Sequence, residues 1–444
     1  MSSTRLLKKR FALLSLGALA LGAAFTAPAV RAQDSGALLN ALVRKGVLSD
    51  QEAEDIRAEL ASESHEAVTT TISGGKSTKA VSITGRLQAQ YAGLGTDPDS
   101  GNGPPSANHF FLRRVYFGVK ATLNANWSAD LNYDFAGKSF DKAYIRWAGN
   151  ISDLPFQFDI GYRKVNFGHE EYTSSGSLKA IERSGATRYF AEDNNGRRLG
   201  AASYRIGLFA DYNPAAFSGK TTGFFAGLAI TNPERNADAT FVADTTSPAT
   251  VGKSNTPAYW ANAGYSGKLG AVACLAGVAG AWLPDQGGLG NANIGRGDDI
   301  TQGAAFLNLT CGRLQVATEF LYAEVGGTAP DGAKANSYVK GFWIQPSCML
   351  TEKCELVGRY SYTDTDGRGI RVSDGIRSSN TLGSAATTNY LNEYYLGINY
   401  YLLGNDLKLQ LGYVGGGTAG GRAAGGAANQ ESVSGLRSQL QVNF

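Results

Sequence analysis

The end of the chain alternates strictly between apolar and polar side chains. Leu436, Leu440, Val442 and the terminal Phe444 fall on one face of an extended strand, and the positions between them are polar. In a water-soluble protein such a segment would be an edge strand on a core. An apolar face that runs to a terminal aromatic residue is also typical of a strand with lipid on one side and water on the other. We therefore predict a transmembrane β-barrel.

The same two-residue period recurs from Val81 onward, with apolar side chains on one face and polar or charged ones on the other. In such a barrel the polar face lines water and the apolar face meets lipid. Tight turns, such as 124–126 and 403–405, alternate with long connections, such as 232–256. The pattern predicts an all-β, closed antiparallel barrel of about sixteen strands, with periplasmic turns and longer outer loops. The predicted strands lie near residues 81–91, 110–123, 127–136, 140–149, 156–163, 197–213, 220–231, 257–266, 269–283, 299–311, 313–325, 335–346, 352–363, 389–402, 406–414 and 431–444.

The N-terminus predicts export. Basic residues up to Arg10 precede an almost wholly apolar run, residues 11–25, and Val30-Arg31-Ala32 is an acceptable small-residue cleavage site. The apolar run is too short to span a membrane. We expect residues 1–32 to be a secretory signal peptide rather than a buried N-terminal helix.

Two short amphipathic helices are predicted in residues 33–61, and Ser49 with Glu52 forms a capping box for the second. Residues 62–80 are rich in Ser, Thr, Gly and Lys and are predicted to be a linker, so the barrel domain comprises 81–444. Because the helices precede the barrel, we expect a short periplasmic helical segment. Its role could be oligomerisation, tethering to the cell wall, or plain packing as a hairpin.

Removal of the signal peptide changes the charge of the chain. The full sequence has 41 basic and 38 acidic residues. Five of the basic and none of the acidic residues lie in 1–32, which leaves 36 and 38, a formal charge of −2. The basic pI of the precursor is therefore no argument for a nucleic-acid partner. After the signal, no apolar run approaches the roughly twenty residues of a spanning helix.

The four cysteines of an exported chain suggest disulfides. Cys348 and Cys354 flank a predicted periplasmic turn and are candidates for one pair. Cys274 and Cys311 lie near the periplasmic ends of neighbouring predicted strands and are candidates for another. The sequence alone does not establish the geometry that either pair requires.

The sequence offers little for catalysis or metal binding. The histidines His65, His109 and His169 are widely spread, and a lone loop histidine is expected to be solvated. There is no Cys/His metal cluster, nucleophile–His–acid spacing or phosphate-cradling glycine loop; the glycine runs 415–417 and 420–421 are predicted to be turns of an outer loop. We predict no metal, no cofactor and no enzymatic activity.

Charged residues occupy the predicted lumen faces. Rings of one charge sign in a narrow pore set ion preference. Mixed charges could instead hydrate the lumen and brace the wall through cross-strand pairs. The basic positions are Arg86, Arg114, Lys120, Lys142, Arg146, Arg163, Arg313, Arg359, Lys408 and Arg437, and the acidic ones are Asp130, Asp134, Asp159, Glu319 and Glu355. Lys408 is expected near the wide periplasmic end.

Residues 160–175, Ile160-Gly161-Tyr162-Arg163-Lys164-Val165-Asn166-Phe167-Gly168-His169-Glu170-Glu171-Tyr172-Thr173-Ser174-Ser175, are followed by Ile181-Glu182-Arg183-Ser184. This stretch resembles the phosphate-selective porin O and P family, in which a strand ending in G-x-(K/R) leads into F-G-x-E, T-S-S and E-R. Further similar pieces are 85–89, 111–114, 131–135 and the terminal strand.

The resemblance implies a trimeric outer-membrane channel of sixteen strands, whose third outer loop, here 164–196, folds inward as the constriction. It implies that Arg86 is a constriction arginine and that Arg113 and Arg114 lie on the outer approach. The chain departs from the family where Tyr162 replaces a usual Arg or Gln, and it has no basic residue in 221–230. These departures leave a specific preference for phosphate open.

We predict an outer-membrane porin for passive diffusion of small hydrophilic solutes, with a preference for anions such as phosphate. Its partners would be outer-membrane lipid, small anions, two further copies in a homotrimer, and the barrel assembly machinery, because the strand ending at Phe444 is similar to the signal that guides barrel insertion. The alternative is a structural barrel that tethers the envelope through its N-terminal helices; an enzyme would need a convergent catalytic set. The predicted pore-lining residues are Arg86, Arg113, Arg114, Lys120, Lys142, Arg146, Arg163, Lys164 and Arg183.

Overall fold

The computed structural model describes residues 78–98, 107–192, 197–232, 256–284, 299–327, 336–377, 388–421 and 430–444. The chain divides into two compact units, Met1–Val68 and Thr69–Phe444, and every described residue belongs to the second. The predicted signal peptide, the two helices and nearly all of the linker lie outside the described residues.

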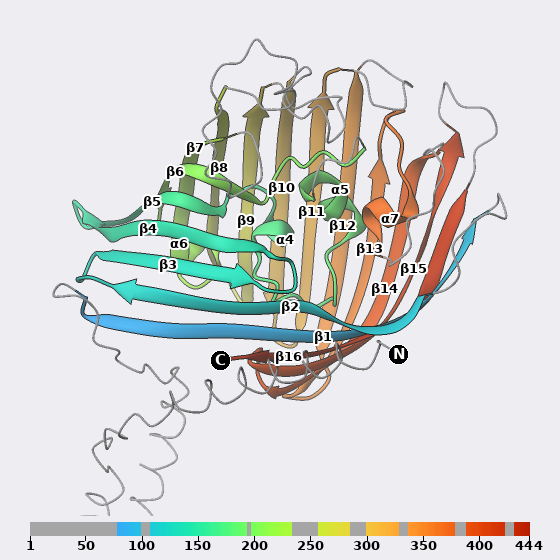
Figure 1. Cartoon of the computed structure of the whole chain (residues 1–444), viewed down its shortest axis with the longest axis horizontal. Helices are drawn as coiled ribbons and strands as arrows, with labels where there is room; N and C mark the ends of the chain where they lie inside the picture. The colour runs from blue at the N-terminus through green and yellow to red at the C-terminus, as the bar shows by residue number, and fades with distance from the viewer. Residues whose placement is uncertain are drawn as a thin grey trace, which may run out of the picture. The chain divides into compact units, whose positions relative to one another are not determined.

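The second unit is a closed antiparallel barrel of sixteen strands, which confirms the predicted class and strand number (Figure 1). Strand β1 (Ala80–Pro98) pairs with β2 (Ala107–Thr122) and with β16 (Glu431–Asn443), so the first and last strands close the barrel. The others follow in sequence order: β3 (Trp127–Asp134), β4 (Ser139–Ile151), β5 (Leu154–Lys164), β6 (Tyr204–Tyr212), β7 (Gly223–Thr231), β8 (Ala258–Leu269), β9 (Val272–Leu283), β10 (Ile300–Cys311), β11 (Leu314–Val325), β12 (Ser337–Met349), β13 (Cys354–Asp364), β14 (Thr388–Leu403) and β15 (Leu407–Gly421). Below, the turn end is the end with the short connections and the loop end is the opposite one.

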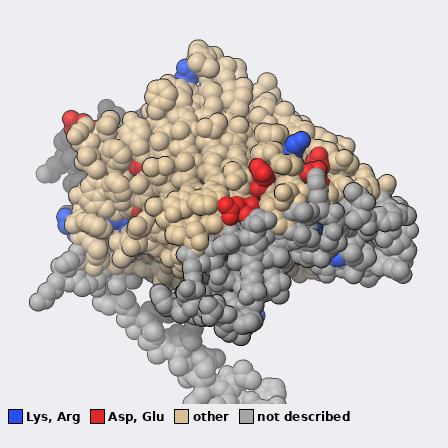
Figure 2. Space-filling view, turned by 90° about the horizontal axis from the view of Figure 1, so that it is seen from above, with Lys and Arg blue, Asp and Glu red and all other residues tan. Residues whose placement is uncertain are grey.

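The two-residue period sorts side chains between the inside and the outside of the barrel. On β16, Leu436 and Leu440 are exposed on the outer wall, whereas Arg437, Gln439 and Gln441 are buried inside. Figure 2 shows a mostly uncharged described surface, with Lys, Arg, Asp and Glu only in small patches. An apolar outer wall is what contact with lipid requires, because unpaired charges are costly there.

The connection between β5 and β6 is described over residues 165–192 and 197–203; this described part lies inside the barrel, and we call it the inner loop (Figure 1). It carries the short helix α4 (His169–Tyr172) and the helix α5 (Gly185–Ala191). Helix α7 (Val372–Gly375), from the β13–β14 connection, packs against α5; helix α6 (Pro214–Phe217) lies in the turn after β6.

One side of the barrel interior is a dry core. The inner-loop residues Phe167 and Phe190 belong to one buried apolar cluster with the wall residues Trp260, Leu321 and Trp343. Close packing of this kind excludes water. The expectation that the inward faces line water is therefore wrong along much of β8–β12, where most buried inward positions are apolar.

Strand β15 is longer than the alternation predicts. It continues to Gly421, so the glycine runs 415–417 and 420–421 belong largely to a strand and not to an outer loop. A β-carbon on Gly416 would lie 2.5 Å from the Cδ1 atom of Ile376. Glycine is needed here because the β13–β14 connection approaches the strand backbone closely.

Candidate functional site

A cavity of about 600 Å³ separates the inner loop from the wall formed by β1–β6. Strand residues supply most of its charges, and serine and threonine hydroxyls of the inner loop face them across the gap. Six basic residues line it among the described residues, and Asp141 is the one acidic side chain in that lining. The basic residues are Arg86, Lys142, Arg146, Arg163, Lys164 and Lys220.

Arg86 bridges the wall and the tip of the inner loop. Its Nε donates to Asn443 Oδ1 at 2.8 Å. Its Nη1 and Nη2 atoms donate to the hydroxyls of Ser175 and Ser174 at 2.7 and 3.2 Å. Within the described part of the chain Arg86 forms no ion pair with a carboxylate, so its charge is not cancelled by direct contact.

The other wall cations form ion pairs in which the two charges lie at different depths. Lys142 Nζ is 2.8 Å from Asp130, and the lysine side chain is 32% exposed whereas the aspartate is 12% exposed. Arg146 donates two hydrogen bonds to Asp159 at 2.7 and 2.9 Å. The Arg146 side chain is 24% exposed and that of Asp159 is fully buried. In both pairs the cation faces the cavity and the carboxylate lies in the wall.

Arg163 lies deeper, between two carboxylates. It is 2.7 Å from Asp159 and 2.8 Å from Asp211, and its side chain is 7% exposed. Asn166 also donates to Asp211 at 2.6 Å. Arg163 therefore braces the wall behind the cavity more than it offers a free charge to a solute.

These features match a known family. The family model of the phosphate-selective porin O and P matches residues 81–444. The chain belongs to this family. A comparison with curated protein sequences gave no match. Because it belongs to this family, the protein is an outer-membrane porin of a Gram-negative envelope, and its family and fold are those of a channel rather than an enzyme.

A comparison with solved structures found porins at low sequence identity. The anion-selective porin from Comamonas acidovorans is 14% identical, with a TM-score of 0.54 over 82% of this chain and 99% of that one. The outer membrane channel DcaP of Acinetobacter baumannii is 12% identical, with a TM-score of 0.49 over 84% of this chain and 99% of that one.

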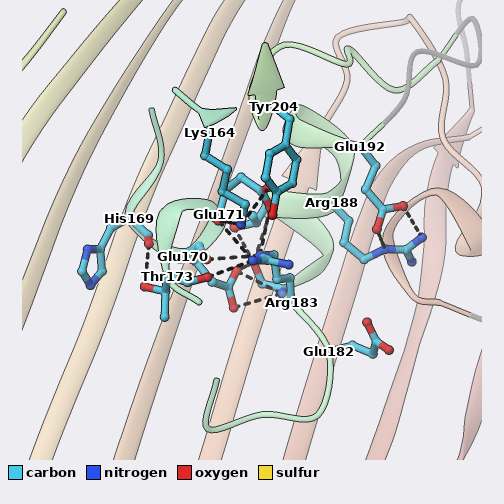
Figure 3. A network of polar contacts seen from close by, with 12 residues as sticks. Lys164, His169, Glu170, Glu171, Thr173, Glu182, Arg183, Arg188, Glu192 and Tyr204 are labelled. Atoms are coloured by element: carbon cyan, nitrogen blue, oxygen red, sulfur yellow. Dashed lines mark hydrogen bonds and ion pairs between the residues drawn. The ribbon is translucent and has the colours of Figure 1, made fainter. Parts of the chain in front are cut away.

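In this porin the inner loop is held in shape by Arg183 (Figure 3). Arg183 pairs with Glu171 at 2.9 Å and donates to the backbone carbonyls of Glu170, Glu171 and Thr173. Burial alone would lower the pKa of Arg183, but the carboxylates of Glu171 and Glu170 raise it above its usual value. Lys164 Nζ also contacts Glu171, at 3.5 Å from the carboxylate. Arg183 is therefore a brace within the loop and does not line the cavity.

A β-bulge turns two successive arginines inward. The β1–β2 register shifts at Gln88, so Arg113 and Arg114 both lie inside the barrel. Arg114 donates to Gln88 at 2.7 Å, and Arg113 donates to Glu182 of the inner loop at 2.7 and 3.1 Å. Burial would raise the pKa of Glu182, but Arg113 and Arg377 hold it well below its usual range. Arg113 thus helps to dock the loop, whereas Arg114 binds a side chain of the neighbouring strand.

Two predicted lumen lysines have different surroundings from those expected. Lys120 is exposed at the turn end, opposite Asp130 in the register, and does not line the cavity. Lys408 is fully buried, with its Nζ donating to the Leu178 carbonyl at 2.8 Å and to Asn405 at 3.2 Å. The inner loop covers Lys408, so this lysine does not face a wide aqueous opening.

Several residues that anchor the inner loop to the far wall were not predicted to do so, although Arg359 and Glu319 were predicted to face the lumen. Arg359 pairs with Glu170 at 3.2 Å and with Glu393 at 2.5 Å, and all three are buried. The backbone N–H of His169 donates to Glu319 at 2.5 Å. A lone Glu or Arg in a strand whose other inward residues are apolar, such as Glu319 on β11, is the signal that could have identified them.

His169 is half-buried, whereas a lone loop histidine is expected to be solvated. Its ring stacks on Phe306 with centroids 4.8 Å apart. Burial lowers the pKa of His169 to about 4. Among the described residues no group of three or more His, Cys, Asp and Glu is placed to hold a metal ion.

All four cysteines are free thiols in this structure. Cys348 lies opposite Leu356 in the β12–β13 register, so Cys354 is one diagonal step away. Cys274 lies opposite Leu309, with Cys311 two residues further along β10. The two disulfides stay predictions.

No helix in the described ranges is long and apolar enough to cross a membrane.

Proposed function

We propose that this porin passes small hydrophilic anions in preference to cations, by passive diffusion through the cavity beside β1–β6. The observation that carries the proposal is the depth difference within the ion pairs. At Lys142 and Arg146 the positive group faces the cavity, and its carboxylate partner lies behind it in the wall. A permeating ion therefore meets the positive ends first, and pore-lining charge of one sign sets ion preference.

The inner-loop side of the cavity does not cancel the positive electrostatic field that the strand residues create. The inner-loop residues that line it are uncharged near pH 7, because the lowered pKa of His169 leaves its imidazole neutral. Arg86 adds a positive charge at the loop tip without a carboxylate in direct contact. The lining from the loop consists of His169, Tyr172, Thr173, Ser174, Ser175 and Ser177. Hydroxyls can donate to any oxyanion or halide, phosphate among them, so this lining admits anions as a class, and the preference over cations comes from the basic residues of the strands.

The assembly is part of the proposal. We expect a homotrimer in outer-membrane lipid, inserted by the barrel assembly machinery, as the family resemblance implies. The terminal strand supports the insertion route, because its apolar face and the exposed ring of Phe444 remain on the outer wall.

The proposal is tested in planar bilayers with purified protein under a KCl gradient. The zero-current potential should have the sign of chloride preference, and replacing chloride by phosphate should leave a measurable current. A permeability ratio of chloride to potassium at or below one would contradict the proposed selectivity.

A further inference from the structure

Three tyrosines that line the cavity each have a cation over the ring. Arg146 lies over Tyr144, with its Cζ atom 4.6 Å from the ring centroid. Lys164 Nζ lies 5.2 Å from the centroid of Tyr204. In addition, Arg86 Cζ lies 5.5 Å from the centroid of Tyr116. All six residues line the same cavity. The negative face of an aromatic ring attracts a cation at these distances.

Two of these tyrosines also bind a carboxylate through the hydroxyl. The Tyr144 hydroxyl donates to Asp130 at 3.3 Å, and Asp130 is the partner of Lys142. The Tyr204 hydroxyl donates to Asp141, the one acidic side chain in the described lining of the cavity. One side chain therefore contacts a cation with its ring and an anion with its hydroxyl.

This arrangement affects where the charges lie without changing their number. Lysine and arginine side chains have many rotamers, and a cation in a narrow pore otherwise moves toward the closest carboxylate. A tyrosine ring is rigid, with only two side-chain torsions, and it keeps its two contacts at opposite ends. It can thus hold the cation toward the cavity while it keeps the carboxylate in the wall.

We propose that Tyr144 is a positioning residue for anion selectivity, which holds the Arg146 guanidinium at the cavity and the Asp130 carboxylate behind it in the pore wall. Tyr204 differs because its cation Lys164 and its carboxylate Asp141 both line the cavity. The inference rests on the proposed anion preference of the porin. Tyr116 has the ring contact with Arg86, and among the described residues its hydroxyl contacts no carboxylate, so it serves as a ring-only comparison.

The test compares Tyr144→Phe and Tyr144→Leu with the unaltered protein, by zero-current potential under a KCl gradient. The Leu variant removes ring and hydroxyl, whereas the Phe variant keeps the ring. The chloride-to-potassium ratio should fall about two- to fivefold in the Leu variant and less in the Phe variant, because a cation–π contact is worth on this order. Tyr204→Leu should lower the ratio less than Tyr144→Leu does, because both partners of Tyr204 line the cavity. The differences should shrink from about 0.1 M to about 1 M KCl, since salt screens charges.

A matched control is Tyr212→Leu, which removes a tyrosine whose ring is tilted against that of Phe156 and which does not line the cavity. Its permeability ratio should not change. Unchanged ratios in both Tyr144 variants, in protein that still conducts, would overturn the inference, and so would equal losses in the Phe and Leu variants, which would leave the ring without a role. An unaltered protein with no anion preference would instead refute the proposed function itself.

Discussion

The ring of Phe444 lies over Gly85, where the last strand meets the first. The Gly85 N–H donates to the Phe444 carbonyl at 2.7 Å, and the Phe444 N–H donates back at 3.1 Å. A β-carbon on Gly85 would lie 2.2 Å from the Cζ atom of that ring. The final residue therefore closes the barrel with both its backbone and its side chain, and a β-carbon at position 85 would displace the ring.

Assembly should depend on this closure. Phe444→Ala removes the ring, and Gly85→Leu displaces it, so both should lower the amount of assembled barrel several-fold. The measurement is the heat-modifiable band of the outer-membrane fraction on a gel. Phe320→Ala, at an exposed phenylalanine in the middle of β11, is the matched control and should assemble almost normally. Equal yields for all variants would show that the closure is dispensable.

Arg86 should set selectivity more strongly than a lysine at the turn end. Arg86→Glu should lower the anion-to-cation permeability ratio at least about threefold, because the charge faces a narrow cavity with low-dielectric walls. Lys120→Glu makes the same charge change on a neighbouring strand, at the position opposite Ser82. That site is four residues, or about 13 Å, nearer the turn end. This distance exceeds the Debye length at physiological salt, so the control should change the ratio little.

Zero-current potentials of the two variants in the same salt gradient decide between these outcomes. Similar shifts for Arg86→Glu and Lys120→Glu would mean that the narrow part of the pore lies elsewhere.

The buried cluster of Arg359, Glu170 and Glu393 should stabilise the docked inner loop. Arg359→Met leaves two buried carboxylates without their cation, and the expected loss of stability is about 3–5 kcal/mol. Urea unfolding of the reconstituted protein measures it. Arg313→Met, at an exposed position in a turn, should change stability by less than about 0.5 kcal/mol.

The same variant reports on the pore. If Arg359 docks the loop, single-channel conductance of Arg359→Met should become larger or noisier, and Arg313→Met should conduct like the unaltered protein. A stable Arg359→Met variant with normal conductance would contradict the proposed anchoring role.

His169 should make the fold less stable in mild acid. Its folded pKa of about 4 lies below the ordinary value of about 6.5, so the unfolded chain binds more protons between these values. Stability should therefore fall as the pH drops from about 6.5 to about 4. Glu182, whose folded pKa is also lowered, contributes a loss only below its ordinary value near 4.5.

To isolate the contribution of the histidine, the apparent unfolding midpoint of the unaltered protein and of a His169 variant is measured at about pH 7 and at about pH 5. His169→Gln should lose less stability between these two values than the unaltered protein does. An identical pH dependence in both proteins would mean that His169 is accessible to protons in the folded state.

The thiols offer a direct redox test. Cysteine Cα atoms on diagonal positions of a sheet are about 7–8 Å apart, and a disulfide needs about 4.4–6.8 Å. A Cys348–Cys354 bond would thus require local adjustment at the β12–β13 turn. Alkylation of the exported protein without reductant distinguishes the two states: protection of both cysteines supports the disulfide, and labelling of both refutes it.

The alternation of side chains was enough to predict the barrel and the inward direction of Arg86. Both follow from local geometry, since every second side chain of a strand shares a face. The inward direction of Arg113 could not be predicted in the same way. It depends on a bulge beside Gln88 that adds one residue to β2, and the sequence gives no local mark of that bulge.

The half of the barrel interior on which the inner loop docks is held by contacts between residues that are far apart in the sequence. The stretch around Glu170 resembles the family motif, but its partners Arg359 and Glu393 lie on strands almost two hundred or more residues later. Likewise, the alternation correctly turns Lys408 inward, and only the position of Leu178 shows that the inner loop covers it. Patterns along one strand identify a face; they do not identify what packs on that face.

The uneven lining of the cavity has a consequence for molecules that carry both signs of charge. Cations lie along the strands near Arg146, and uncharged hydroxyls such as that of Ser175 lie along the inner loop, so the electrostatic field runs across the pore as well as along it. A zwitterion in transit would be turned so that its carboxylate faces the strands and its ammonium group faces the loop. Passage would then depend on the orientation of a solute's dipole, and two isomers of equal size and net charge would cross the membrane at different rates.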